Sequence, residues 1–142
     1  MLSLTCKTAV KAVLFLASRN KTGTNAGIKE IAENIEGNEH TVGKLLQTLV
    51  KEGIINSVKG PFGGFHITTQ QLKKPIITIV EAIDGKNVFK ECGLGLSRCS
   101  STHPCPIHNE FKIVRDQLQA LFLQKKIIDL CENVNLGLAH LF

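Results

Sequence analysis

The sequence is constrained most by a glycine-rich segment that lies between two short apolar stretches. Residues 54–58 and 65–68 have the β-branched and aromatic composition of strands, with Phe65 and Ile67 alternating onto one face. The segment that separates them reads Lys59-Gly60-Pro61-Phe62-Gly63-Gly64. Glycines allow a tight turn and a close approach of the backbone to a ligand. We therefore predict a β-hairpin with a glycine-rich tip and a cation at its base.

Three amphipathic segments precede this hairpin. Apolar residues recur at helical spacing in residues 4–18, 28–35 and 42–49, and Gly53 follows the last of them. A tight turn separates the second segment from the third, which is the outline of a helix-turn-helix. With the hairpin behind them, these segments predict a mainly α fold, a winged helix-turn-helix over residues 1–75 in which the hairpin is the wing.

The polar side of the third segment carries a stripe of hydrogen-bond donors. Its members are spaced by 4, 3 and 4 residues and share one helix face opposite the apolar one. Lys and Gln donate hydrogen bonds to base acceptors in the DNA major groove, although an ordinary solvated helix face has the same appearance. The wing beside it favours DNA binding. The DNA-contacting residues that we predict are His40, Thr41, Lys44, Gln47 and Lys51 of this helix, with Lys59 and Gly60 of the wing.

The positive charge of the chain lies in the same half. The net charge is +5, and residues 1–75 hold ten Lys/Arg against five Asp/Glu, whereas residues 76–142 hold seven of each. A basic half attached to a neutral half is typical of a polyanion-binding module, while solubility is the plainer explanation. The chain has no Trp and no Tyr, which argues against an aromatic platform for single-stranded nucleic acid. Double-stranded DNA is therefore the partner we expect.

The second half of the chain, residues 76–142, predicts two further helices. A short one covers about 76–83 and is ended by Asp84-Gly85. A long one covers about 106–131, since its apolar positions alternate by 4 and 3 residues and only Lys125 interrupts them. A helix of about 25 residues, at ~1.5 Å per residue, is too long to pack wholly on a small winged domain. We predict that it dimerises the chain; packing against the first helix alone is the alternative. The seam consists of Ile107, Phe111, Val114, Leu118, Leu121 and Ile128.

Residues 85–108 form an aperiodic loop that holds three of the five cysteines. Cys92, Cys99 and Cys105 are spaced by seven and six residues, and His108 lies three residues beyond the last. Thiolate and imidazole ligands suit zinc or an iron–sulfur cluster. The gaps are wider than the C-x-x-C knuckle of most zinc sites, and they better suit a loop around a multi-atom cluster. Alternatively, the three thiols are unligated and His108 is a surface residue.

Two further cysteines lie on helical faces. Cys6 and Cys131 each occupy an apolar stretch, where we expect them to be small buried hydrophobic residues. No stretch approaches the ~20 apolar residues that span a bilayer. The apolar N-terminus contains Lys7 and Lys11 and is followed by no cleavage site, so it predicts a folded helix and not a signal peptide. We therefore expect a cytoplasmic protein.

The sequence resembles the Rrf-two family of bacterial transcription regulators, and the resemblance covers nearly the whole chain. The strongest match is the wing, residues 57–65. Shorter matches are Ala9-Val10, Glu30-Ile31-Ala32, residues 49–53 and Asn135-Leu136-Gly137-Leu138-Ala139. The resemblance implies a homodimer of two winged heads joined by crossed long helices, which binds a near-palindromic operator.

Within that family the chain is most similar to the cluster-binding branch, which includes IscR-like and NsrR-like members. The branch has three loop cysteines, matched here by Cys92, Cys99 and Cys105, and IscR-like members add a histidine that His108 matches. Some NsrR-like members use an acid from the first helix instead; residues 5–8 contain none. The resemblance favours a 2Fe–2S cluster. The gap between the first two cysteines is one residue longer than in the IscR-like pattern, so a 4Fe–4S cluster is the alternative.

These observations predict a DNA-binding transcriptional regulator, a repressor or a dual regulator, whose operator affinity is controlled by an iron–sulfur cluster. The cluster would sense iron–sulfur status, redox state or nitric oxide. The alternative is a cluster-free regulator of the same fold that responds to thiol oxidation or zinc. An enzyme is not predicted, because a thiol-dependent enzyme needs a nucleophile with an oriented base, and the sequence shows no such constellation.

Overall fold

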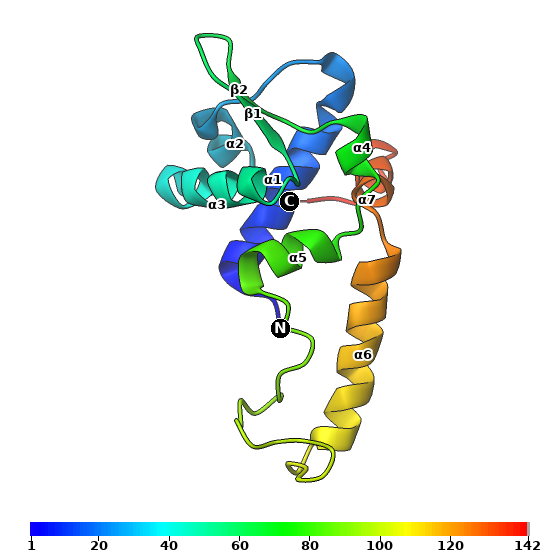
Figure 1. The fold of residues 1–142 in the computed structure, drawn as a ribbon. Helices are drawn as coiled ribbons and strands as arrows, with labels where there is room; N and C mark the ends of the chain where they lie inside the picture. The colour runs from blue at the N-terminus through cyan, green and yellow to red at the C-terminus, as the bar shows by residue number, and fades with distance from the viewer. Residues whose placement is uncertain (142) are drawn as a thin grey trace.

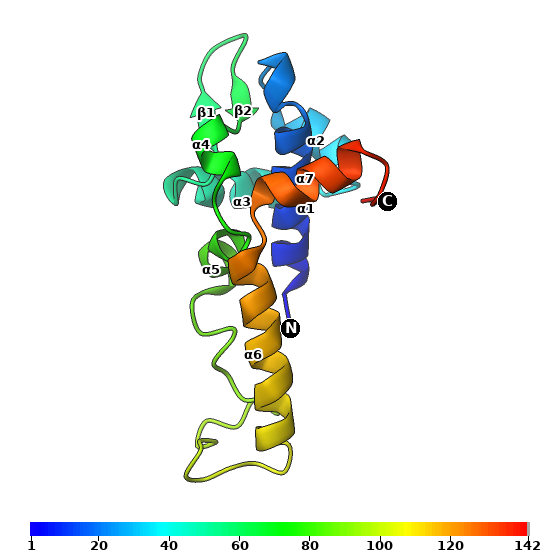
Figure 2. The ribbon, with the colours of Figure 1, turned by 90° about the vertical axis from the view of Figure 1, so that its right-hand side faces the viewer.

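The computed structural model describes residues 1–141, and most of them are helical (Figure 1). The head of the molecule is built from the first half of the chain with α5 and α7, and α6 extends away from it as a stalk (Figures 1 and 2). The elements in chain order are α1 (Leu4–Ser18), the 3-10 turn η1 (Asn20–Thr22), α2 (Ile28–Asn34), α3 (Glu39–Lys51), β1 (Asn56–Val58), β2 (Gly64–His66), α4 (Thr69–Leu72), α5 (Ile77–Asp84), α6 (His108–Gln124) and α7 (Ile127–Asn135).

Helix α1 begins at Leu4 because Ser3 caps it. The Ser3 hydroxyl oxygen accepts a hydrogen bond from the Cys6 N–H at 3.0 Å. The Ser3 backbone N–H and hydroxyl in turn donate to the two carboxylate oxygens of Asp84, at 2.9 and 2.5 Å. Since Asp84 is the last residue of α5, these bonds tie the start of α1 to the end of α5.

The helix-turn-helix that the sequence predicts is confirmed. Asn38 caps α3 by accepting the Thr41 N–H at 3.1 Å. The apolar side of α3 is buried in the head, with Val42, Leu46 and Leu49 among its core residues. Both α2 and α3 pack on α1, so the polar side of α3 is left facing solvent.

The wing is also confirmed, with strands shorter than the sequence suggests. β1 and β2 pair antiparallel, with Ser57 opposite Phe65. Phe65 also exchanges two backbone hydrogen bonds with Ala26, at 2.8 and 3.0 Å, which fastens the wing to the segment before α2. Gly64 has a φ of +140°, and a Cβ there would lie 2.6 Å from the Ala26 carbonyl oxygen. A glycine is therefore required where the two backbones meet.

The hydrophobic core extends beyond residue 75, the boundary expected for the winged domain. Ile79 of α5 and Ile127 of α7 belong to the same buried cluster as the residues of α1, α2 and α3. Cys131 of α7 belongs to that cluster, and Cys6 of α1 lies in a smaller one beneath α5. Both thiols are buried, which confirms the prediction. Burial, with the Asp84 carboxylate close by, raises the pKa of the Cys6 thiol to about 12.

The prediction of one long helix over residues 106–131 is wrong. Helix α6 ends at Gln124, Lys125 is extended with ψ of 127°, and α7 begins at Ile127. The break has a tertiary cause. The Lys125 carbonyl accepts the Ile76 N–H at 2.9 Å, and the Ile127 N–H donates to the Lys74 carbonyl at 3.0 Å. These bonds replace the intrahelical ones, so α7 turns back into the core.

Within residues 1–141, no helix has both the length and the hydropathy that crossing a membrane would require.

The contact between Gly64 and Ala26 can be tested by substitution. We expect Gly64→Ala to lower the free energy of unfolding by about 2 kcal/mol, because it adds a positive-φ cost to a backbone clash. Gly43→Ala, inside α3 with only ordinary contact at 3.5 Å, should instead raise it by about 0.5–1 kcal/mol. Equilibrium urea unfolding at one protein concentration measures both. Equal effects of the two substitutions would contradict this account of the wing.

Candidate functional site

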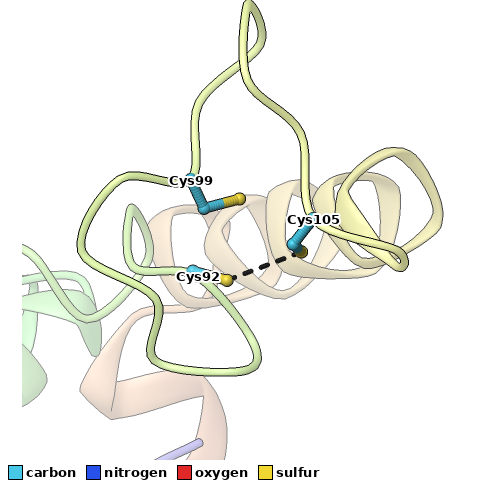
Figure 3. A group of neighbouring side chains, drawn as sticks. All are labelled: Cys92, Cys99 and Cys105. Atoms are coloured by element: carbon cyan, nitrogen blue, oxygen red, sulfur yellow. Dashed lines mark hydrogen bonds between the residues drawn. The ribbon is translucent and has the colours of Figure 1, made fainter.

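The loop between α5 and α6 brings three cysteines together at the far end of the stalk (Figure 3). The Sγ atoms of Cys92, Cys99 and Cys105 all lie within 4.8 Å of one another. The sulfurs of Cys92 and Cys105 lie 3.6 Å apart, within hydrogen-bonding distance, and all three cysteines are half-buried free thiols. The convergence that the sequence predicts for these residues is therefore present.

His108 joins this group through one of the three thiols. It is the first residue of α6, and its backbone N–H donates to the Cys105 carbonyl at 3.0 Å. Its ring Nδ1 lies 3.1 Å from the Cys99 Sγ. His103, which lies in the same loop, lines a hollow of about 410 Å³ together with Cys99 and Cys105. His108 is thus in direct contact with one thiol, and His103 borders the same hollow as two of them.

The aperiodic loop is ordered by turns of its own. The Leu94 N–H donates to the Cys92 sulfur at 3.4 Å, and the Gly95 N–H donates to the Cys92 carbonyl at 2.9 Å. Further along, Ser100 and His103 exchange two backbone hydrogen bonds at 3.1 and 3.2 Å. These turns fold the chain back on itself, whereas residues six or seven apart in one helix would lie at least ~9 Å from each other along its axis.

Two residues of α6 hold the loop against the stalk, and sequence reasoning assigned neither to the site. The Arg115 guanidinium donates to the carbonyls of Lys90 and Glu91, both at 2.9 Å. The Phe111 ring packs on Gly93, where a Cβ would lie 2.9 Å from it. The sequence prediction placed Phe111 in the dimer seam. The available signal was the spacing of His108, Phe111 and Arg115 by 3 and 4 residues, which puts them on one helix face.

The hydrogen bonding of the loop favours an ionised thiol. Backbone N–H groups of Leu96 and Leu94 lower the pKa of the Cys92 thiol to about 7. The pKa of the Cys99 thiol is raised, because burial and the two neighbouring thiols outweigh the Cys105 N–H that lowers it. A thiolate is the form of cysteine that binds metals. A cation among three thiols this close would also relieve the repulsion between their ionised forms.

The sulfur positions fit coordination to soft metals. Two thiolates on one tetrahedral zinc ion, at about 2.3 Å each, lie about 3.8 Å apart. The 3.6 Å between Cys92 and Cys105, and the 4.8 Å limit for the triad, are close to that spacing. The open hollow beside Cys99 and Cys105 leaves room for a larger group. The donor set therefore suits zinc or an iron–sulfur cluster.

The predicted DNA-contacting residues lie at the other end of the molecule (Figures 1 and 2). The stripe on α3 is exposed, and Ile28 with the α3 residues Glu39, His40, Lys44 and Gln47 lines a shallow hollow of about 580 Å³. The loop of the wing is exposed as well. All seven residues predicted to contact DNA are exposed. They are His40, Thr41, Lys44, Gln47, Lys51, Lys59 and Gly60.

Comparison with known proteins identifies the family. The Rrf2 family model, described as an iron-dependent transcriptional regulator, matches residues 2–133. An HTH-type transcriptional regulator of Aquifex aeolicus is 31% identical over 117 residues, which cover 81% of this chain and 79% of that protein. An HTH-type regulator of Neisseria meningitidis is 28% identical over 123 residues, which cover 84% of this chain and 82% of the relative.

Solved structures share the fold. CymR (YrzC), the global cysteine regulator of B. subtilis, superposes with a TM-score of 0.76 at 17% identity, covering 93% of this chain and 96% of that one. IscR of T. potens superposes with a TM-score of 0.73 at 18% identity, covering 99% of this chain and 92% of that one. The mainly α winged helix-turn-helix fold is thereby confirmed.

The matched family consists of transcriptional regulators and not of enzymes, in agreement with the winged head and with the sequence prediction. Since the family model spans residues 2–133, the chain belongs to the Rrf2 family of transcriptional regulators.

Proposed function

We propose that this regulator binds operator DNA as a homodimer and that an iron–sulfur cluster, held by Cys92, Cys99, Cys105 and His108, controls its affinity. The observation that carries the proposal is the convergence of three Sγ atoms within 4.8 Å, with the His108 ring against one of them. The description of the family as iron-dependent supports the choice of metal. When bound, the cluster would supply a centre that is sensitive to iron supply, oxidants and nitric oxide.

The contacts of the chain connect the loop to the DNA-binding surface. Arg115 and Phe111 fasten the loop to α6. At the other end of α6, Phe122 packs on Phe89 with the two rings tilted and their centroids 5.8 Å apart, against the cluster that contains Cys6 of α1. Helix α1 in turn packs on α3. A change of loop shape on loss of the cluster would therefore reach α3 through packed elements.

A second candidate function is a cluster-free regulator that responds to zinc or to thiol oxidation. The 3.6 Å between the sulfurs of Cys92 and Cys105 favours it, because this distance suits a single tetrahedral ion and brings two thiols next to each other. Anaerobic purification separates the candidates. A cluster protein is coloured and contains iron with acid-labile sulfide, whereas a zinc protein is colourless.

Alanine substitutions test the ligands. Cys92→Ala, Cys99→Ala and Cys105→Ala should each abolish the visible absorbance of the anaerobic protein, because the loop offers no other thiolate. His108→Ala should weaken or shift the spectrum, since water or another donor replaces imidazole. Cys131→Ala, in α7, is the matched control and should leave the spectrum unchanged. If one of the loop variants retains the full spectrum, the residue substituted in it is not a ligand.

Two lysines of α3 test the DNA contact. The probe is a duplex selected from a randomised library by the wild-type protein. Lys44→Ala should weaken its binding free energy by about 1–3 kcal/mol and relax the base preference at one position of each half-site. Lys51→Ala should weaken binding to all DNA sequences alike. It should also reduce the slope of log affinity against log salt concentration by about one unit per head. Lys112→Ala on α6, where Lys112 pairs with Asp116 at 2.5 Å, is the control. Binding titrations at several salt concentrations measure each effect, and unchanged affinity of Lys44→Ala would remove α3 from the interface.

The proposed dimer uses an apolar surface of α6 that this chain leaves exposed. Val114 is 60% and Leu121 is 49% exposed. Leu121 also borders an apolar hollow of about 450 Å³, which Leu2, Val10 and Leu130 line from the head. By contrast, Leu118 of the predicted seam is half-buried against the core of its own chain. Two heads in one dimer imply a near-palindromic operator, with half-sites separated by one or more helical turns of ~34 Å.

Charge substitutions test this surface. Val114→Asp and Leu121→Asp should each convert the dimer into a monomer and lower operator affinity, because an interface would have to desolvate the carboxylate. Leu123→Asp is the control, since Leu123 is 53% exposed and lies about 200° around the helix from Leu121. Sedimentation velocity measures the mass. If Val114→Asp and Leu121→Asp both remain dimers, the interface lies elsewhere.

A further inference from the structure

The wing carries an exposed aromatic side chain to which the proposed DNA contacts of the basic residues give no role. Phe62 is 92% exposed, whereas every other phenylalanine among residues 1–141 is buried or half-buried. It lies between Pro61 and Gly63 in the loop that joins β1 to β2. In both views this loop projects beyond the rest of the head (Figures 1 and 2). The ring is therefore presented at an extremity of the molecule.

The backbone that carries Phe62 is held in place from two sides. The Asn25 side-chain amide donates to the Phe62 carbonyl at 3.1 Å. The Gly63 N–H donates to the Gly60 carbonyl at 3.0 Å and closes the turn. A Cβ at Gly63 would lie 2.1 Å from the Val58 carbonyl oxygen, so the loop passes the end of β1 at a distance that only glycine allows. A side chain on such a fixed backbone loses little backbone entropy on binding.

The surroundings of Phe62 suit a polyanion. Residues 56–68 contain no Asp or Glu, and Lys59 lies three residues before the ring. Proteins that dock on the minor groove combine cations with apolar side chains, Phe among them, that insert between base pairs and partly unstack them. Pro61 and Phe62 together form a blunt apolar tip of that kind beside a cation.

We propose that Phe62 is an apolar wedge that enters the minor groove and unstacks a base step in each half-site of the operator. This inference rests on the proposed binding of duplex DNA. Pyrimidine–purine steps unstack most easily, so the wedge selects such a step without hydrogen bonds to its bases. Phe62 is thus a specificity-determining residue, and it adds a bend in the DNA to the contacts made by α3.

The test compares Phe62→Ala with Phe62→Leu, which keeps an apolar wedge. The probe is the duplex selected by the wild-type protein, with 2-aminopurine placed in turn at each step outside the bases read by α3. A fluorophore pair on the duplex ends reports bending. We expect the wild type and Phe62→Leu to raise 2-aminopurine fluorescence at one step per half-site and to bend the duplex. Phe62→Ala should do neither and should bind roughly tenfold more weakly, the loss expected from one stacking contact.

Each outcome decides between the possibilities. Because Phe62 is exposed, its variants should keep the unfolding midpoint, the dimer mass and the visible spectrum of the wild type. Wild-type affinity and bending in Phe62→Ala would overturn the wedge and leave the proposed function standing. Weaker binding of Phe62→Ala, with no fluorescence change in the wild type at any step, would also overturn insertion. A wild-type protein that selects no duplex would overturn both proposals.

Discussion

The arrangement of the molecule depends on two backbone hydrogen bonds between segments that lie about fifty residues apart in the sequence. The Ile76 N–H donates to Lys125, and the Ile127 N–H donates to Lys74. This pairing ends α6 at Gln124 and directs α7 into the core, where Ile127 is fully buried. As a result, α6 projects from the head as a stalk, and the cysteine loop lies at the end opposite the wing.

If the chain works as proposed, the separation of the two surfaces defines how a signal would travel through it. Asp84 accepts both Ser3 hydrogen bonds at the start of α1 and lies at the end of α5, where the cysteine loop begins. The N-terminal end of α1 therefore contacts the base of the loop, and the same helix packs on α3. A rigid helix that touches both regions can pass a displacement at the loop to the orientation of α3. The two ends need no direct contact.

Local pattern was sufficient for the elements whose causes are local. The bounds of α1, the apolar side of α3 and the wing with its glycine tip follow from periodicity and turn chemistry, and the cysteine spacing predicted the convergence at Cys92, Cys99 and Cys105. The break at Lys125 could not be predicted, because a distant segment supplies the hydrogen bonds that cause it. Periodicity also could not separate the apolar positions of α6 that face the chain's own loop from those left exposed. The short α4 was missed although Thr68 and Gln71 form a capping box that the sequence displays.

The chemistry of the loop links the two candidate functions. The backbone hydrogen bonds that lower the pKa of the Cys92 thiol to about 7 favour its thiolate, which is the form that binds metals and also the form that oxidants attack. The Cys105 sulfur is 3.6 Å away, so under the two proposed functions metals and oxidants would compete for the same sulfurs. A disulfide would draw two sulfurs to about 2.05 Å, whereas a cluster would hold them apart. The loop would therefore take a different shape in each proposed state, and Arg115, which holds its first segment on α6, would pass either shape to the same stalk.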